Sequence, residues 1–280
     1  MHGKIVRLAT AFALLAEFGV TILGCKREAN GNGKEAPVII FRSADGRTLT
    51  LDDLRGENGT LRYEVFRGKS VPAEAESLHK QAREAGERGE YQLSINLLSR
   101  ASEIAPDWPY PVYDKAYDYL LMEDYDAARV YYSQTVAMAP RGFFTAFTAV
   151  DILGRELRGE FPPGTYRQYV VLEWVEDRVK RTQLLQAMVD RMPRLAPAWK
   201  DLVGLVEDDA ERLSAIEKGL AAEPDAETKG MLLINKAVLM DQQGDHKGAI
   251  RILGELAVDP KSTLATEHLA KMHLASLAEK

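Results

Sequence analysis

Few residues of this 280-residue chain have the type and spacing needed for catalysis or metal binding. The sequence contains one cysteine, Cys25, and five histidines: His2, His79, His246, His268 and His273. A single cysteine excludes a disulfide within the chain and a metal site built from cysteines. The five-residue spacing of the last two histidines places them on different faces of a helix. The sequence also lacks the motifs of a nucleophile elbow, a zinc protease or a phosphate-binding loop. We therefore expect no enzyme activity, no metal and no cofactor.

The position of Cys25 points to attachment to a membrane. Two basic residues precede an apolar stretch at residues 8–23, and Gly24 stands directly before the cysteine. A charged start, an apolar middle and a small residue at the cut are typical of a secretory signal. The stretch Ile22-Leu23-Gly24-Cys25 resembles the bacterial lipobox. This resemblance implies cleavage after Gly24 and a diacylglycerol group on the Cys25 sulfur.

A lipid on Cys25 would place the protein in the bacterial cell envelope, anchored to a membrane and facing the periplasm or the cell exterior. Acyl chains hold a soluble domain at a bilayer because each buried methylene contributes about 0.8 kcal/mol. The polar, glycine-containing stretch at 26–36 suits a flexible tether. Glu17, inside the apolar stretch, keeps three alternatives open: an uncleaved anchor, an ordinary signal peptide and a cytosolic chain.

An internal repeat marks the helices that would position side chains for binding. The pair Glu90-Tyr91 recurs as Asp124-Tyr125 after 34 residues, which divides this part of the chain into blocks at 75–108 and 109–142. The same offset relates small residues and closing prolines: Ala82 and Ala116, then Pro106 and Pro140. Small residues let two antiparallel helices approach closely, and a proline ends a helix.

Each block resembles the tetratricopeptide repeat, a 34-residue helix–turn–helix unit. The tyrosines that open the second helix, Tyr91 and Tyr125, match this family, whereas Leu78, Val112 and Glu123 depart from its pattern. The resemblance implies a mainly α fold of antiparallel helix pairs stacked into a solenoid. Residues 195–260 follow the pattern more loosely, with His246 at the tyrosine position, and residues 262–279 have the pattern of a capping helix.

In this family the first helix of each repeat lines a concave groove, which identifies candidate binding residues. Position five of the three successive first helices is occupied by His79, Tyr113 and Phe147, and position nine by Arg83, Tyr117 and Asp151. Stacked repeats would align each set in a row. Aromatic anchors flanked by charge suit an extended peptide or strand. The alternative is that these aromatic residues only pack the repeats together.

The remaining segments complete the expected domain plan. Residues 37–70 contain short β-branched and aromatic runs separated by Asp-Gly and Asn-Gly turns, which predicts a small β-rich segment. Residues 167–192 have a helical pattern outside the repeat. The plan is a signal peptide (1–24), a lipidated cysteine and tether (25–36), a β-rich segment (37–70), repeats (71–160), an irregular helical insertion (161–194), and degenerate repeats with a cap (195–280).

The charge balance of the expected mature chain narrows the choice of partner. Removal of residues 1–24 takes away two of 36 basic and one of 42 acidic residues, which leaves 34 against 41 and a net charge of −7. Nucleic-acid binding needs clustered cations, so we expect a protein or peptide partner and no nucleic acid. The main hypothesis is a non-catalytic interaction scaffold. The alternative is a ligand-binding or enzyme-accessory lipoprotein with a pocket between the β-rich segment and the repeats.

Overall fold

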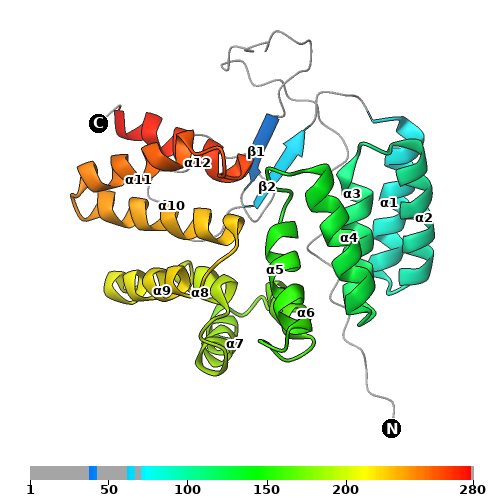
Figure 1. Ribbon diagram of the computed structural model, residues 1–280, viewed down its shortest axis with the longest axis horizontal. Coiled ribbons are helices and arrows are strands. Elements are labelled where there is room, and N and C mark those ends of the chain that lie inside the picture. The colour runs from blue at the N-terminus through cyan, green and yellow to red at the C-terminus, as the bar shows by residue number, and fades with distance from the viewer. Residues whose placement is uncertain (1–37, 43–61, 67–70, 279–280) are drawn as a thin grey trace.

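The computed structural model describes residues 38–42, 62–66 and 71–278. These contain twelve α-helices, one 3-10 helix and a two-stranded sheet. Figure 1 shows α1–α4 side by side at one end of the molecule and α10–α12 at the other, with α5 between them. Cys25 and the rest of residues 1–37 lie outside the described part of the chain.

The first two repeats form the four antiparallel helices that the 34-residue offset predicts. They are α1 (Ala73–Glu87), α2 (Tyr91–Ile104), α3 (Pro109–Leu121) and α4 (Tyr125–Met138). Each tyrosine aligned by the repeat is the first residue of its helix. The turn between α3 and α4 lacks the glycine that the first repeat has at Gly89, and Glu123 adopts the left-handed conformation there, with φ 65°. A residue with positive φ ends the helix without altering the packing of the pair.

Small residues stand where paired helices touch. Ala82, Ala116 and Ala128 are fully buried, and Ser94 is nearly so. A larger side chain at these positions would force the helices apart, because protein interiors are close-packed. The alignment therefore identified the contact face of each helix correctly.

Aspartate side chains begin many of the later helices. Asp124 Oδ1 accepts a hydrogen bond from the Ala127 amide at 3.0 Å. Equivalent bonds cap four further helices, at Asp177, Asp208, Asp225 and Asp245. An aspartate at this position satisfies backbone amides that lack a partner inside the helix, and its charge favours the positive end of the helix dipole.

The middle of the chain departs from the repeat pattern. After α5 (Ala146–Leu157), the helical pattern at 167–192 corresponds to a series of separate elements outside the repeat. It divides into α6 (Thr165–Val170), the 3-10 helix η1 (Val171–Trp174) and α7 (Arg178–Arg191). The break occurs because Asp177 caps a new helix by accepting a hydrogen bond from the Lys180 amide at 3.0 Å. A 3-10 turn frequently ends a helix in this way.

The C-terminal repeats follow the looser sequence pattern and fold back toward α5. They comprise α8 (Ala196–Val203), α9 (Asp209–Ala221), α10 (Ala226–Gln242), α11 (His246–Val258) and α12 (Leu264–Ala278). The Leu264 amide donates to the Arg141 carbonyl at 2.7 Å, and the Thr148 hydroxyl donates to Asp225 at 3.0 Å. The starts of α12 and α10 are therefore both held against the α4–α5 loop and α5 (Figure 1).

Two strands lie against this helical body. β1 (Val38–Arg42) pairs antiparallel with β2 (Arg62–Phe66), with Val38 opposite Phe66, and β1 contacts α12. The strand expected at 47–51 and the helical turn expected near 50–54 lie outside the described residues. Within the described part of the chain, no helix has the length and apolar character needed to cross a bilayer.

Candidate functional site

The first helices of the repeats, α1, α3 and α5, carry the side chains predicted to line a binding groove. His79 on α1 is buried, and its Nε2 lies 2.7 Å from Oδ2 of Asp114 on α3. Its ring also packs edge-on against Trp108, with centroids 4.8 Å apart. His79 therefore joins the first repeat to the second.

Tyr113 on α3 is held by packing and by a hydroxyl contact. Its hydroxyl lies 2.8 Å from Thr145 Oγ1, which in turn lies 3.1 Å from the Tyr166 hydroxyl. Its ring contacts Phe143 and Phe144 at centroid distances of 5.6 and 5.3 Å. Burial raises the pKa of Tyr113 well above its ordinary value. The side chain is only partly accessible, and these contacts favour a packing role.

Tyr117, one turn further along α3, meets a segment from outside the repeats. Its ring lies 6.5 Å from that of Trp174 on η1, in an edge-on arrangement. Burial raises the pKa of Tyr117 above its ordinary value, and the negative charge of Glu173 adds to that increase. The α6–η1 segment therefore covers part of the inner face of α3.

Two further members of the predicted rows, Arg83 and Phe147, are partly exposed. Arg83 on α1 is half-buried, and its side chain interacts with another group of the protein. Phe147 is half-buried near the start of α5, one turn before Asp151. Phe147 is thus a partly exposed aromatic side chain on an inner helix.

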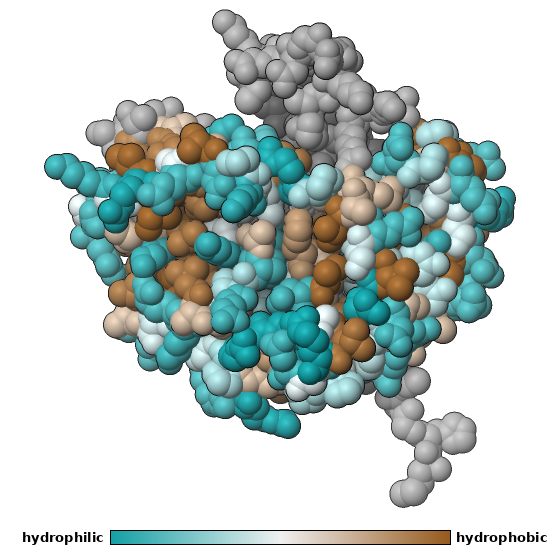
Figure 2. Space-filling model, in the orientation of Figure 1, coloured by the Kyte–Doolittle hydropathy of each residue, from teal (hydrophilic) through white to brown (hydrophobic). Residues whose placement is uncertain are grey.

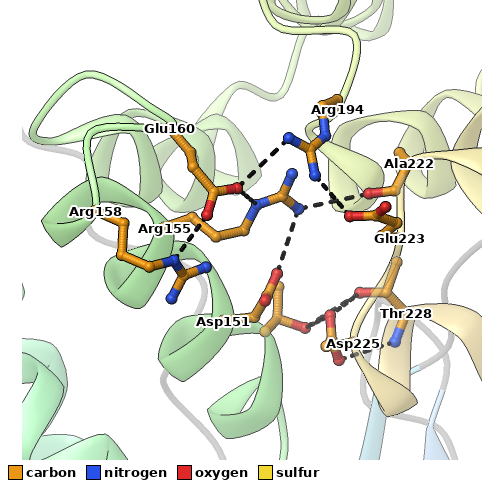
Figure 3. A network of polar contacts seen from close by, with 10 residues as sticks. Asp151, Arg155, Arg158, Glu160, Arg194, Ala222, Glu223, Asp225 and Thr228 are labelled. Carbon is orange, nitrogen blue, oxygen red and sulfur yellow. Dashed lines mark hydrogen bonds and ion pairs between the residues drawn. The ribbon is translucent and has the colours of Figure 1, made fainter.

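Asp151 belongs to an ionic network rather than to the aromatic row. One of its carboxylate oxygens lies 3.6 Å from Arg155, and Arg155 also donates to Glu160 at 3.1 Å and to the Ala222 carbonyl at 3.5 Å (Figure 3). Burial raises the pKa of Asp151, and the charge of Arg155 opposes that rise. Arg155 itself is 3% exposed and its guanidinium stacks over Phe161 at 4.5 Å.

The same network ties distant parts of the chain together. Arg194, from the α7–α8 loop, donates to Glu223 at 2.6 Å and lies 3.6 Å from Glu160. Figure 3 shows Arg158 directed at the other oxygen of Glu160, to which it donates at 2.7 Å. Since these residues come from α5, the loop that follows it, the α7–α8 loop and the α9–α10 turn, the network connects the C-terminal repeats to α5.

The aromatic residues of the 165–174 segment pack against the repeats, although the repeat pattern does not extend to them. Tyr166 and Tyr169 are buried among the repeats, and the Tyr169 hydroxyl donates to Asp201 on α8 at 3.0 Å. Glu156 accepts hydrogen bonds from the amides of Gly164 and Tyr166, both at 2.7 Å, which positions the start of this segment. The sequence feature that could have identified this segment is its high content of aromatic residues in a stretch that does not follow the repeat.

The described surface combines scattered apolar patches with a shallow pocket. The side of the molecule seen in Figure 2 carries its apolar surface in separate patches divided by polar residues. A shallow, open pocket of about 470 Å³ lies near Trp199, where Lys218 stands over the indole ring at 4.9 Å and Arg194 lines one wall. Within the residues that the structure describes, no group of three His, Cys, Asp or Glu side chains could hold a metal ion.

Comparisons with known proteins give likenesses of architecture alone. No family model and no curated protein matches the sequence. Among solved structures, TTC0263, a thermophilic TPR protein of Thermus thermophilus, is 16% identical over 74% of this chain and 100% of its own, with a TM-score of 0.32.

Two further solved structures give similar values. The TPR2AB domain of yeast Sti1, in its complex with pHSP90, is 14% identical over 74% of this chain and 86% of its own, with a TM-score of 0.34. A tetratricopeptide repeat protein of Parabacteroides merdae ATCC 43184 is 12% identical over 72% and 85%, with a TM-score of 0.33. Nothing about binding follows from likenesses of this size. The helix pairs of this chain, joined in series with small residues at their contacts, are themselves TPR-like.

Proposed function

We propose that this protein is a non-catalytic scaffold of the bacterial cell envelope that binds a protein or peptide partner along the inner helices of its repeats. The observation that carries the proposal is a set of partly exposed aromatic side chains at the junctions of the first repeats. The rings of Trp108, Tyr110 and Phe144 contact one another in series, and Phe147, on α5, follows three residues after Phe144. Aromatic side chains offer a large apolar area with few rotamers to restrict, which suits the anchoring of a partner.

Charged groups beside these aromatic side chains would orient the partner. Asp114 and Asp151 lie on the inner helices, and Glu173 is exposed on η1. All three side chains interact with other groups of the protein, so they contribute mainly to orientation and specificity. Helices held by tertiary contacts present such a surface in a fixed geometry, which lowers the entropic cost of binding.

Site-specific photo-crosslinking tests this assignment in the cell envelope. A photo-reactive phenylalanine analogue at Phe147 should crosslink a discrete partner. The same group at Leu157, which is 65% exposed at the far end of α5, is the matched control. Specific products from position 157 and none from position 147 would place the binding surface elsewhere.

The membrane anchor is a separate part of the proposal and rests on the lipobox resemblance. We expect Cys25→Ser to abolish metabolic labelling with a fatty acid and to leave an uncleaved precursor or a soluble protein. Serine lacks the thiol to which the lipid is attached. Labelling that continues unchanged in this variant would show that Cys25 is not the lipid site.

One observation favours the alternative function. β1 contacts α12, so the β strands lie against the C-terminal repeats. A small-molecule site between strands and helices would give an accessory lipoprotein with a pocket. Thermal stabilisation of the protein by a small envelope ligand, with no crosslinked protein at position 147, would support this alternative.

A further inference from the structure

A buried carboxyl group lies where the first helix pair meets α3. Asp118 on α3 is 5% exposed, and it packs between the end of α1 and the start of α2. A methyl group added to Gly86 of α1 would lie 3.3 Å from Asp118 Oδ1 and 3.7 Å from Ser94 Oγ of α2. Asp118 Oδ2 is buried and has no hydrogen-bond partner among the residues that the structure describes. A carboxylate in this position would carry a poorly compensated charge.

The charged groups around Asp118 do not compensate for this burial. On α3 itself, Asp114 lies one turn earlier and pairs with His79 of α1. Arg83, one turn after His79 on α1, does not bind the buried Oδ2 of Asp118. At the start of α2 the titratable groups are Tyr91 and Glu90, and Glu90 pairs with the exposed Arg88.

The balance of these contacts favours the neutral acid. Burial raises the pKa of Asp118 to about 7; a hydrogen bond from Ser94 opposes the rise and the negative charge of Asp114 adds to it. A neutral carboxyl group can occupy this position without an uncompensated charge, whereas the ionised form is disfavoured in low-dielectric surroundings.

We propose that the α1–α2 hairpin is a pH-sensitive end of the repeat array, which docks firmly on α3 while the Asp118 carboxyl is protonated and loosens when it ionises. The hairpin is the first helix pair of the array, and its main helical contact beyond itself is with α3. Terminal repeats make one inter-repeat interface instead of two, so they open at a lower free-energy cost than central ones. Loosening would change the face that carries His79 and Trp108.

The direction of the effect follows from proton linkage. Because the docked state holds its proton more tightly than the opened state, docking is strongest at low pH and weakens as pH rises toward about 7. Above that value both states are ionised and the effect levels off. Between pH 6 and pH 8 the opening equilibrium constant should increase about tenfold.

Hydrogen exchange of the full chain at pH 6 and pH 8, corrected for intrinsic rates, measures this opening. In the wild type, the protection factors of the α1 and α2 amides should be about tenfold lower at pH 8 than at pH 6, whereas those of α10–α12 should not change. Asp118→Asn, which mimics the neutral acid, should abolish that difference. Asp126→Asn alters an 84% exposed carboxylate on α4 and should behave like the wild type. An equal pH response in Asp118→Asn and the wild type would overturn the proposal.

Carbon-13 NMR of the side-chain carboxyl groups provides a second measurement that does not depend on how the variant folds. The Asp118 signal should titrate with a midpoint near 7 in the wild-type protein. A midpoint below 5 would also overturn the proposal, because the carboxyl group would then be ionised at both pH values.

Discussion

Replacing Arg155 with alanine is expected to lower the free energy of unfolding by about 2–4 kcal/mol. Arg155 is 3% exposed and connects Asp151, Glu160 and the Ala222 carbonyl. Removal of the guanidinium leaves the two carboxylates without a partner cation and the Ala222 carbonyl without its donor. It also removes the cation–π contact with Phe161. The expected loss stays below the upper range for buried ion pairs because both carboxylates are about 30% exposed. Denaturant-induced unfolding measures the change.

Arg158→Ala is the matched control, because Arg158 binds the same Glu160 carboxylate from the solvent side. Its side chain is 59% exposed, and pairs of this kind contribute little to stability. We expect a change within about 0.5 kcal/mol. Equal losses in the two variants would mean that the network does not hold α5 to the C-terminal repeats.

The helix pairs could be predicted because their signal is local and periodic. Alanines at the helix contacts, tyrosines at helix starts and prolines after helix ends recur at a fixed spacing, and each has a physical reason to stand there. Glu123 shows that the pattern tolerates a departure, since a left-handed glutamate replaces the usual glycine without loss of the turn. The same reasoning located α11, where His246 takes the tyrosine position and Asp245 caps the helix.

The return of the C-terminal repeats to α5 could not be predicted from these patterns. It depends on contacts such as Thr148 with Asp225 and Arg141 with Ser262, between residues 77 and 121 positions apart. Threonine, serine, aspartate and arginine are common, and no spacing rule links such pairs along the chain. Likewise, the periodicity of residues 167–192 indicated a helix but not the 3-10 turn that brings Trp174 against Tyr117.

The candidate groove residues separate into two kinds for the same reason. The 34-residue register predicts which residues align in rows on successive first helices. It does not predict which other segments of the chain pack over those rows. His79, Tyr113 and Tyr117 contact other parts of the chain, whereas Phe147 is the row member that we assign to partner contact. A role in binding for the first three residues is therefore best tested against a role in stability.

The double variant Tyr113→Ala, Tyr117→Ala is expected to lower the free energy of unfolding by about 4–6 kcal/mol. Truncating one fully buried aromatic side chain to alanine costs about 3–5 kcal/mol of stability. Because both tyrosine rings are partly exposed, the sum for the two lies below twice that range. The loss also includes the Tyr113 hydroxyl contact with Thr145 and the ring contact with Trp174. Since a domain of this size is stable by only about 5–15 kcal/mol, Tyr113→Phe, which loses the hydroxyl alone at about 1 kcal/mol, should be measured beside it.

Partner capture per folded molecule, measured on the same variants, separates the two roles. Phe147→Ala, on the next inner helix, should retain most of the stability. If Phe147 anchors the partner, the binding free energy should weaken by about 1–2 kcal/mol. We expect the tyrosine variants to show the reverse, a loss of stability with capture per folded molecule largely retained, because their rings hold the 143–145 segment and η1 in place. A double variant that melts like the wild type but fails to capture the partner would instead place both tyrosines at the binding surface. In that case α6 and η1 would have to move aside when the partner binds, because Trp174 now lies where the partner would contact Tyr117.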